Sequence, residues 1–441
     1  MGLQAPLLWL LPVALLVGVA HGGAAAHAPG SAPRAPPQLD WLADQAADLL
    51  TKCTIAAHDG TVLFTPDASG SYGAQWTRDF AYMLAADGGS VFVRANISVE
   101  TVRRAVQYQF RAQRADGCMP DRVQADGVAV FSPGAASAPF ADHAIDNMPF
   151  SALLLTAFMA FASPPSPAVA ASSVPTQAPA AGGLAQQCDL FCALEPQVRR
   201  AMDFLVRRDA LVFNDGAHPN CTYGFTDTVA KAGRLLFSSL LAMQASRDMA
   251  GWSTRCACGG AAQWANEAAA AGSAVAARLF DARLGLFVAC DAGPNVLPDV
   301  WGSALAVHLG VATGAQAGAV VAQLAAQVDA VFQQGQVRHL PAPLVWGACF
   351  AGACPTPGTY QNGAYWATPL AWVLPVLQAH GQAALAGRLA AQALAAFQAD
   401  GITECVNADL HYHGVLRYVA SATNALAGMR TVPPPPARTA L

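Results

Sequence analysis

Carboxylate side chains gather at the entrances of predicted helices, although the chain is poor in charge. Only 12% of its 441 residues are Asp, Glu, Lys or Arg. Two carboxyl groups on opposite sides of a bond can catalyse its hydrolysis, because one donates a proton while the other activates water. The candidates for such a pair are Asp79, Asp121, Asp126, Asp142, Asp146, Asp227, Asp299, Glu404 and Asp409.

An aspartate ahead of a helix has a common alternative role, which is to cap the first turn. Capping explains Asp299 and is an alternative for Asp146 and Asp227. Glu404 is harder to explain in this way, because it lies too far ahead of a helix predicted at 414–428 to cap it. A lone carboxylate between Ile402 and Cys405 must otherwise be exposed or find a partner.

The segment YGAQWTRDFAYML at 72–84 combines aromatic and charged residues in a way that capping does not require. Thr77 or Asp79 could cap the helix, and Arg78 could pair with Asp79 at the surface. The alternative is a binding site. Rings such as Tyr72 and Trp76 pack on the C–H face of a sugar, and the charged pair can hydrogen-bond its hydroxyl groups.

The elements that carry these residues are predicted to be mainly helical, because helical periodicity is frequent and alternating β-patterns are short and few. Helices are expected near 39–51, 76–87, 98–114, 146–161, 190–207, 226–247, 260–280, 299–311, 315–331, 361–379, 382–399 and 414–428.

No strict repeat is visible, but the second helix of each successive pair follows a polar, aromatic or Gly/Pro-containing motif. These motifs are YGAQWTRDF, ADHAIDNMPF, NCTYGFTDTV, LPDVWGSA, TYQNGAYWATP and GITECVNADLHYHGV. If six outer helices surround six inner ones, the six motifs converge at one end of the ring. Inner helices should then be apolar almost all round, as FSALLLTAFMAFA and GRLLFSSLLAM nearly are.

From about residue 40 to 428, this pattern resembles the six-hairpin glycosidase-like superfamily, which includes glucoamylase-like and trehalase-like enzymes. WTRDF resembles the W-x-R-D stretch with which such enzymes hold a terminal sugar. TYQNGAYW, PDVWGSA and YGFTDT are similar to one bacterial and algal branch. The resemblance implies an all-α (α/α)6 toroid with short β elements in its loops, and a glycoside hydrolase that needs no cofactor.

The resemblance also implies the catalytic residues. The acid comes from the loop before the sixth helix and the base from the loop before the twelfth, which correspond to Asp227 and Glu404. Inverting cleavage of a terminal glycosidic bond of an oligo- or polysaccharide follows. Asp227 departs from the glutamate of glucoamylase-like members, although trehalase-like members use aspartate.

Other residues of the six motifs are expected to bind substrate, with core packing or turn formation as the alternative for each. They are Tyr72, Trp76, Arg78, Asp79, Asp146, Asn147, Trp301, Gln361, Asn362, Tyr365, Trp366 and His413. The segment 114–134 is predicted to be an ordered loop or hairpin over the pocket mouth. No metal is expected, because the calcium-loop spacing is absent and substrate contact explains His413 better than metal binding.

The termini and one internal stretch differ in composition from the rest. We expect a signal peptide at 1–24, a disordered linker at 25–37, a catalytic domain at 38–430 with a low-complexity insertion at 162–183, and a disordered tail at 431–441. A buried or anchoring helix is the alternative for residues 5–20, because a positively charged start is missing. Sequons at Asn96 and Asn220 agree with a secreted glycoprotein.

The chain has 11 cysteines, which also favours secretion. CDLFC at 188–192, CAC at 256–258 and CFAGAC at 349–354 indicate local disulfides, and the odd total leaves at least one cysteine outside intramolecular pairs. Zinc is the competing interpretation, but paired C-x-x-C motifs with matching histidines are missing.

Composition and missing motifs exclude several classes of function. A net charge of −4 without Lys/Arg blocks argues against nucleic acid, and no membrane span is expected after signal removal. The resemblance implies a carbohydrate substrate, and we expect a monomer. The alternatives are a sugar epimerase or polysaccharide lyase, with His411, Tyr412 or His413 as base, and a non-catalytic glycan-binding protein.

Overall fold

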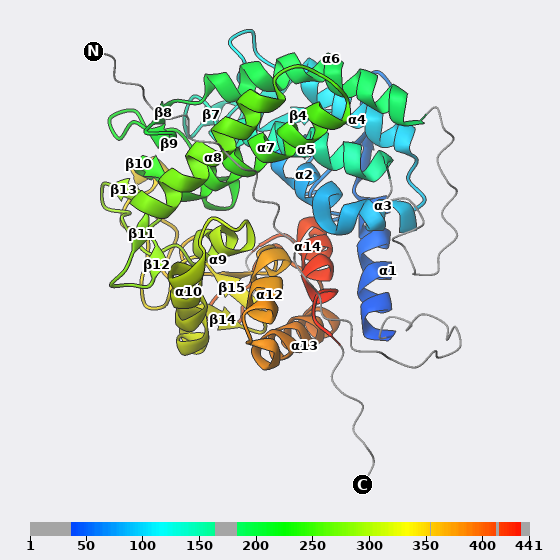
Figure 1. Ribbon diagram of the computed structural model, residues 1–441. Helices are drawn as coiled ribbons and strands as arrows, with labels where there is room; N and C mark the ends of the chain where they lie inside the picture. Colours follow the sequence, from blue (N-terminus) through cyan, green and yellow to red (C-terminus); the bar gives the residue numbers. More distant parts are fainter. Residues whose placement is uncertain (1–36, 164–182, 353, 412–413, 434–441) are drawn as a thin grey trace, which may run out of the picture.

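The computed structural model describes residues 37–163, 183–352, 354–411 and 414–433 (Figure 1). The predicted signal peptide lies outside these residues, as do nearly all of the linker, the interior of the insertion, most of the tail and His413. Within the described residues, no helix is long and apolar enough to cross a membrane.

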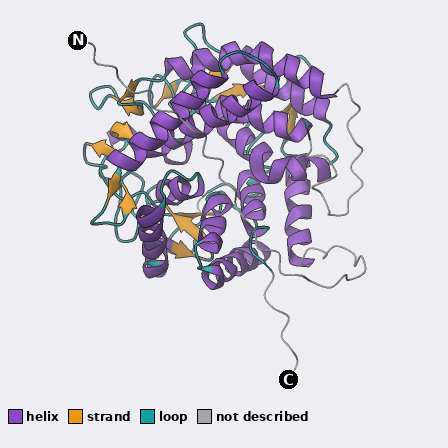
Figure 2. Cartoon of the chain, in the orientation of Figure 1, coloured by secondary structure: helices purple, strands orange, loops and turns teal. Residues whose placement is uncertain are grey.

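Helices dominate the chain (Figure 2), which confirms the mainly helical prediction, and each predicted helical segment overlaps an observed one. They are α1 (Pro37–Lys52), α2 (Thr77–Ala85), α3 (Ser90–Arg94), α4 (Val99–Arg111), α5 (Asn147–Ala162), α6 (Gly183–Phe204), α7 (Leu236–Arg255), α8 (Ala261–Arg278), α9 (Val300–His308), α10 (Gly314–Ala326), α11 (Val328–Val331), α12 (Leu370–Ala379), α13 (Ala383–Asp400) and α14 (Val419–Met429).

Six of these helices contact one another in a closed cycle. α2 packs on α5, α5 on α7, α7 on α9, α9 on α12, α12 on α14, and α14 returns to α2. The helices α1, α4, α6, α8, α10 and α13 each pack against a member of this cycle from outside. The first and last helices of the chain therefore lie side by side, as the blue and red ribbons of Figure 1 show.

Burial separates the two sets of helices as the sequence pattern predicted. In α5 only Ala160 is exposed, and in α9 every residue before His308 is buried. The outer helix α8 instead buries one stripe, Trp264, Ala268, Ala271 and Val275, at the spacing of a helix face. The largest hydrophobic cluster extends from Leu42 to Met429, so both ends of the described chain share one core.

Short antiparallel strands connect the helices. They are β1 (Thr54–Ala56), β2 (Val62–Phe64), β3 (Ala74–Trp76), β4 (Arg122–Gln124), β5 (Ala129–Val130), β6 (Gly134–Ala135), β7 (Ala138–Pro139), β8 (Arg207–Arg208), β9 (Leu211–Asn214), β10 (Ala232–Leu235), β11 (Phe280–Asp281), β12 (Leu286–Phe287), β13 (Cys290–Ala292), β14 (Phe332–Gln333), β15 (Gln336–Arg338) and β16 (Tyr365–Trp366). The sheet β3-β4-β5 contains the predicted hairpin of 114–134 and pairs Trp76 with Arg122.

Three inner helices begin later than predicted. The segments expected at 226–247, 361–379 and 414–428 become helical only at Leu236, Leu370 and Val419. The preceding residues form a 3-10 turn with strand β10, a turn with strand β16, and a loop bridged between Thr403 and Leu416. Their backbone groups pair across strands, which a sequence-local helical pattern does not reveal.

Cys188 bonds to Cys256 and Cys192 to Cys258, while Cys349 and Cys354 close a short loop. The prediction of local pairing is thus correct only for the last motif, because the first two motifs are brought together where α6 meets the α7–α8 turn. The remaining cysteines are buried and outside disulfides, namely Cys53, Cys118, Cys221, Cys290 and Cys405. Disulfides persist in oxidising compartments, which is compatible with the predicted secretion.

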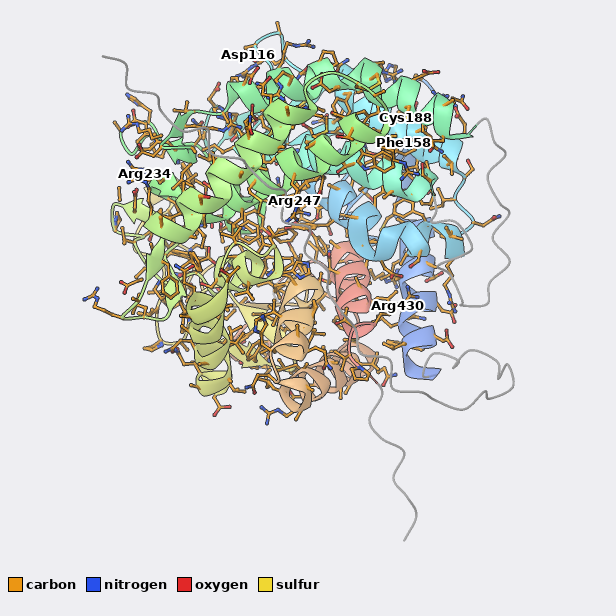
Figure 3. All side chains as sticks on the ribbon, viewed as in Figure 1. Asp116, Phe158, Cys188, Arg234, Arg247 and Arg430 are labelled. Atoms are coloured by element: carbon orange, nitrogen blue, oxygen red, sulfur yellow. A yellow bond between two sulfur atoms is a disulfide. The ribbon has the colours of Figure 1, made fainter. Side chains whose placement is uncertain are left out.

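We predict that Phe158→Ala lowers the free energy of unfolding by about 3–5 kcal/mol, because it leaves a cavity in the inner helix α5. Phe158, labelled in Figure 3, is 1% exposed within the main core. Ala160→Ser, at the exposed position of the same helix, is the control and should change stability by less than about 0.5 kcal/mol. Chemical denaturation measures both. Equal stability of the two variants would contradict the assigned burial.

Candidate active site

A cavity of about 390 Å³ lies at the end of the ring where the inner helices begin. It is lined by Pro66, Tyr72, Trp76, Arg78, Asp79, Arg122, Pro133, Gly134, Phe140, Gly224, Phe225, Asp227, Thr228, Tyr360, Glu404 and Tyr418. The loops before α2, α7, α12 and α14 all contribute. The structure therefore brings together both predicted catalytic carboxylates and the aromatic and charged residues of the motif WTRDF.

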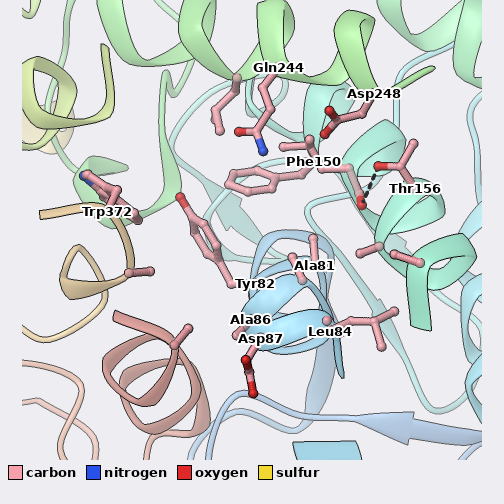
Figure 4. Close-up of a pocket in the computed structure, with 18 of the residues that line it drawn as sticks. Ala81, Tyr82, Leu84, Ala86, Asp87, Phe150, Thr156, Gln244, Asp248 and Trp372 are labelled. Carbon is pink, nitrogen blue, oxygen red and sulfur yellow. Dashed lines mark hydrogen bonds between the residues drawn. The ribbon is translucent and has the colours of Figure 1, made fainter. Parts of the chain in front are cut away.

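A larger cavity of about 690 Å³ opens among the inner helices away from these loops (Figure 4). Tyr82 and Phe150 form part of its wall, and its carboxylates Asp87 and Asp248 pair with arginines. None of the predicted site residues lines it. Tyr82 packs against Phe225 of the smaller cavity, with ring centroids 5.9 Å apart, so an aromatic layer separates the two spaces.

Asp121 connects the two arginines of the smaller cavity. Its Oδ1 accepts from Nη1 of Arg78 at 2.6 Å, and its Oδ2 accepts from Nη1 of Arg122 at 2.9 Å. Asp121 is fully buried, whereas Arg122 also lies over the Trp76 ring, 5.2 Å from its centroid. The hairpin β4–β5 thereby fixes both Arg78 and the aromatic wall.

Asp79 is the third residue of α2, whose N-cap position is occupied by Trp76, so Asp79 is not the cap of this helix. The Tyr418 hydroxyl donates to Asp79 Oδ1, and Arg78 Nε lies 4.0 Å from Oδ2. Burial raises the pKa of Asp79 to about 6. Arg78 and Asp79 are 4% and 2% exposed, so the alternative of a surface ion pair is wrong.

Asp227 follows the 3-10 turn Gly224–Thr226 and lies nine positions ahead of the first residue of α7. It therefore does not cap that helix, and the capping alternative is wrong. Nε2 of Gln361 donates to Asp227 Oδ1 at 2.8 Å. Burial raises the pKa of Asp227 to about 7, although the nearby Arg78 opposes this shift.

Glu404 is 4% exposed and comes from the loop before α14. The Tyr72 hydroxyl lies 3.3 and 3.4 Å from its two carboxylate oxygens, and the Val415 N–H donates to Oε2 at 3.3 Å. Burial raises the pKa of Glu404 to about 8, and the negative charges of Asp79 and Asp227 add to this shift.

Gly224 is required where two parts of the site meet. A Cβ at this position would lie 1.7 Å from Arg78 Nε, so no other residue fits without displacing the guanidinium. The Gly224 N–H donates to Asp146 Oδ2 at 2.8 Å. Asp146 therefore supports the turn that carries Asp227, although it does not line the cavity, and burial raises its pKa to about 6.

Several predicted substrate-binding residues lie outside the cavity lining. They are Asp146, Asn147, Trp301, Gln361, Asn362, Tyr365 and Trp366. Asn147 donates to the carbonyls of Met119 and Phe131, and Asn362 bonds within its own loop region. Trp301 and Trp366 are completely buried in the core.

The other candidate carboxylates are accounted for by local structure. Asp126, Asp142 and Asp409 are exposed, whereas the Asp299 side chain accepts from the Gly302 N–H at 2.8 Å and caps α9 as predicted.

Four aromatic residues that line the cavity are not predicted from the sequence, namely Tyr360, Tyr418, Phe225 and Phe140. Tyr418 had a recognisable signal, because it occupies the position before α14 that Trp76 occupies before α2. The late start of α14 concealed this correspondence.

No protein-family model matches the chain, and no curated protein matches it at a significant level. Solved structures do match. A GH63 mannosylglycerate hydrolase from Thermus thermophilus, in complex with glucose, has a TM-score of 0.63 at 16% identity, covering 88% of this chain and 100% of that one. The chain has the fold of this hydrolase.

Two rhamnosidases share the fold over a part of their length. The enzyme from Klebsiella oxytoca, with rhamnose bound, has a TM-score of 0.58 at 16% identity, covering 90% of this chain and 64% of the rhamnosidase. The GH78 enzyme from Bacillus sp. GL1 has a TM-score of 0.55 at 12% identity, covering 89% of this chain and 34% of its own. The predicted resemblance to glycoside hydrolases of this architecture is thus confirmed at the level of fold.

We predict that Gly224→Ala displaces Arg78 and weakens ligand binding at this cavity at least about tenfold, a loss of about 1.4 kcal/mol. Gly216→Ala is a matched control in the same region, because its added Cβ meets a single side-chain atom, at 3.1 Å. Calorimetry with mixed oligosaccharides measures binding. Unchanged affinity in Gly224→Ala would show that the guanidinium does not take part.

Proposed function

We propose that residues 38–430 form a glycoside hydrolase that cleaves a terminal glycosidic bond by inversion, with Asp227 as general acid and Glu404 as general base. The observation that carries the proposal is that two buried carboxyl groups from different loops line one cavity beside Arg78 and Asp79. Hydrolysis of a glycosidic bond uses such a pair, with water activated opposite the leaving group.

Hydrogen-bond donors support this division of roles. Glu404 receives the Tyr72 hydroxyl on both oxygens and the Val415 N–H on Oε2, and these donors stabilise its ionised form against the larger effect of burial, which still raises its pKa above that of Asp227. Asp227 receives one donor from a side chain, on Oδ1. Its other oxygen can carry the proton that a leaving oxygen needs. Arg78 and Asp79 would bind the hydroxyl groups of the terminal sugar.

The closed cycle of inner helices supports an (α/α)6 toroid, with the cavity at one end of its axis. The aromatic layer around Tyr82 and Phe225 closes the floor of this cavity. A closed floor makes a pocket, which accepts a chain end more readily than the middle of a polysaccharide. This supports action on a terminal residue.

The alternative of an epimerase or lyase has less support. Such enzymes need a base near a C–H bond, typically His or Tyr. Among the described residues no histidine lines the cavity, and burial together with nearby carboxylates raises the pKa of Tyr360 and Tyr418. A non-catalytic glycan-binding protein is the outcome that the next experiment distinguishes.

We predict that Asp227→Asn and Glu404→Gln each reduce kcat by at least about 100-fold, because each removes one partner of the proton transfers. The purified protein is screened on mixed oligosaccharides, with released sugar identified by mass and its anomer by NMR. Asp126→Asn, at an exposed carboxylate, is the control and should retain full activity. Glycan binding without sugar release by the native protein would favour the binding protein.

We predict a narrow bell-shaped pH profile with its maximum between about pH 7 and 8. The active pair holds one proton, and burial raises the pKa values of Asp227 and Glu404 to about 7 and about 8, so the active form, with the proton on Asp227, is the minority form of the singly protonated pair. Below this window both groups are protonated and no base remains, whereas above it both are ionised and no acid remains. Initial rates of hydrolysis measure the profile. A maximum near pH 4 would contradict the assignment.

We predict that the substrate is neutral. Among the described residues that line the cavity, Arg78 and Arg122 are the cations, and both are bound to Asp121. The negative charge of Asp121 offsets these cations, and a sugar carboxylate would also face the carboxyl groups of Asp79 and Glu404. For the sugar released in the screen, the neutral 4-nitrophenyl glycoside should have a kcat/KM at least about tenfold above that of its uronic acid analogue. Equal values would contradict this prediction.

A further inference from the structure

The side chain of Gln361 is held in one orientation. Its Oε1 accepts from the Thr228 N–H at 2.8 Å and from the Thr228 hydroxyl at 2.7 Å. Its Nε2 donates to the Gly224 carbonyl at 3.2 Å. A backbone N–H can only donate and a carbonyl can only accept, so reversing the amide would break both backbone interactions. The position of the amide nitrogen is therefore fixed by its surroundings.

The second N–H of this amide points to Asp227 Oδ1, at 2.8 Å. All four hydrogen-bonding positions of the Gln361 amide are then used within the protein. The side chain is 1% exposed and does not line the cavity. Gln361, which the sequence predicted to bind sugar, thus has no group left for a hydroxyl.

We propose that Gln361 is the positioning residue of the acid, holding Asp227 Oδ1 as a hydrogen-bond acceptor so that the transferable proton is carried on Oδ2. This inference rests on the proposed role of Asp227. Because an amide N–H donates more strongly to a carbonyl oxygen than to a hydroxyl oxygen, this bond favours the proton on Oδ2 over Oδ1. The carboxyl group is held in one rotamer by the same contact.

The proton balance follows from this arrangement. As the bond between the anomeric carbon and the leaving oxygen breaks, the Oδ2 proton moves to that oxygen and the electron pair of the broken bond stays with it. Water adds to the anomeric carbon and gives its proton to Glu404. Asp227 is then a carboxylate, and the Gln361 N–H stabilises its new charge. Proton exchange with solvent restores both groups.

Replacing Gln361 tests the inference. Gln361→Leu keeps the size of the side chain and removes its amide, and Gln361→Asn retains an amide but withdraws it by one methylene. Both should raise the pKa of Asp227, because the amide N–H that stabilises the carboxylate in the native protein is no longer in contact with it. We expect the pKa of Asp227 to rise by about one unit, which moves the maximum of the pH profile about half a unit to higher pH, and kcat to fall about tenfold.

Asn362→Leu is the matched control. Asn362 is the neighbouring residue and bonds to the Trp346 N–H and the Pro355 carbonyl, but not to Asp227. This variant should lose stability while its pH profile stays that of the native protein. If Gln361 had a purely structural role, its variants would behave like Asn362→Leu, with lower stability and an unchanged pH profile.

A second readout keeps this inference separate from the proposed function. The Asp227 carboxyl carbon can be titrated by NMR in the native protein and in the Gln361 variants, which requires no substrate. A native protein that hydrolyses glycosides, with no shift in pH profile or titration for the Gln361 variants, overturns the inference alone. An inactive native protein overturns the proposed function, whereas the titration still shows whether Gln361 controls the pKa of Asp227.

Discussion

The shared ion pair of Asp121 with Arg78 and Arg122 is the constraint on which the site depends. Both guanidinium groups are almost fully removed from water, and a buried charge without a partner costs several kcal/mol. One carboxylate satisfies both, which ties the hairpin β4–β5 to the first turn of α2. Arg78 is then held against Gly224, where it also faces Asp79 and offsets part of the pKa shift of Asp227. Removing Asp121 would release all of these contacts together.

The sequence predicts the helices well because inner helices such as α5 and α9 are apolar almost all round and outer ones such as α8 have a single apolar stripe. Six of the residues expected at a site do line the cavity, namely Tyr72, Trp76, Arg78, Asp79, Asp227 and Glu404, the last two chosen through the resemblance to glucoamylase-like enzymes. The sequence does not predict which cysteines pair, because Cys188 and Cys256 meet only through the packing of α6 on α7. Nor does it place Gln361, whose role depends on a contact with Asp227 across 134 positions.

The late starts of α7 and α14 have the same origin. The residues around Asp227 and Glu404 form their hydrogen bonds with distant strands and loops, so local propensity carries little information there. Because Asp227 and Glu404 lie in these irregular segments ahead of α7 and α14, their carboxyl groups can reach the cavity. The errors of the prediction therefore concentrate at the residues with the strongest claim to a function.

The contacts of Tyr72 with Glu404 and of Tyr418 with Asp79 join positions 332 and 339 residues apart. During synthesis, a nascent chain that has not yet exposed its last hairpin has neither partner, however well its earlier hairpins have formed. High contact order slows folding, because loop closure must precede the stabilising contacts. The first hairpins can therefore form before the ring closes, whereas these two contacts, and with them the complete cavity, can form only at the final step of assembly.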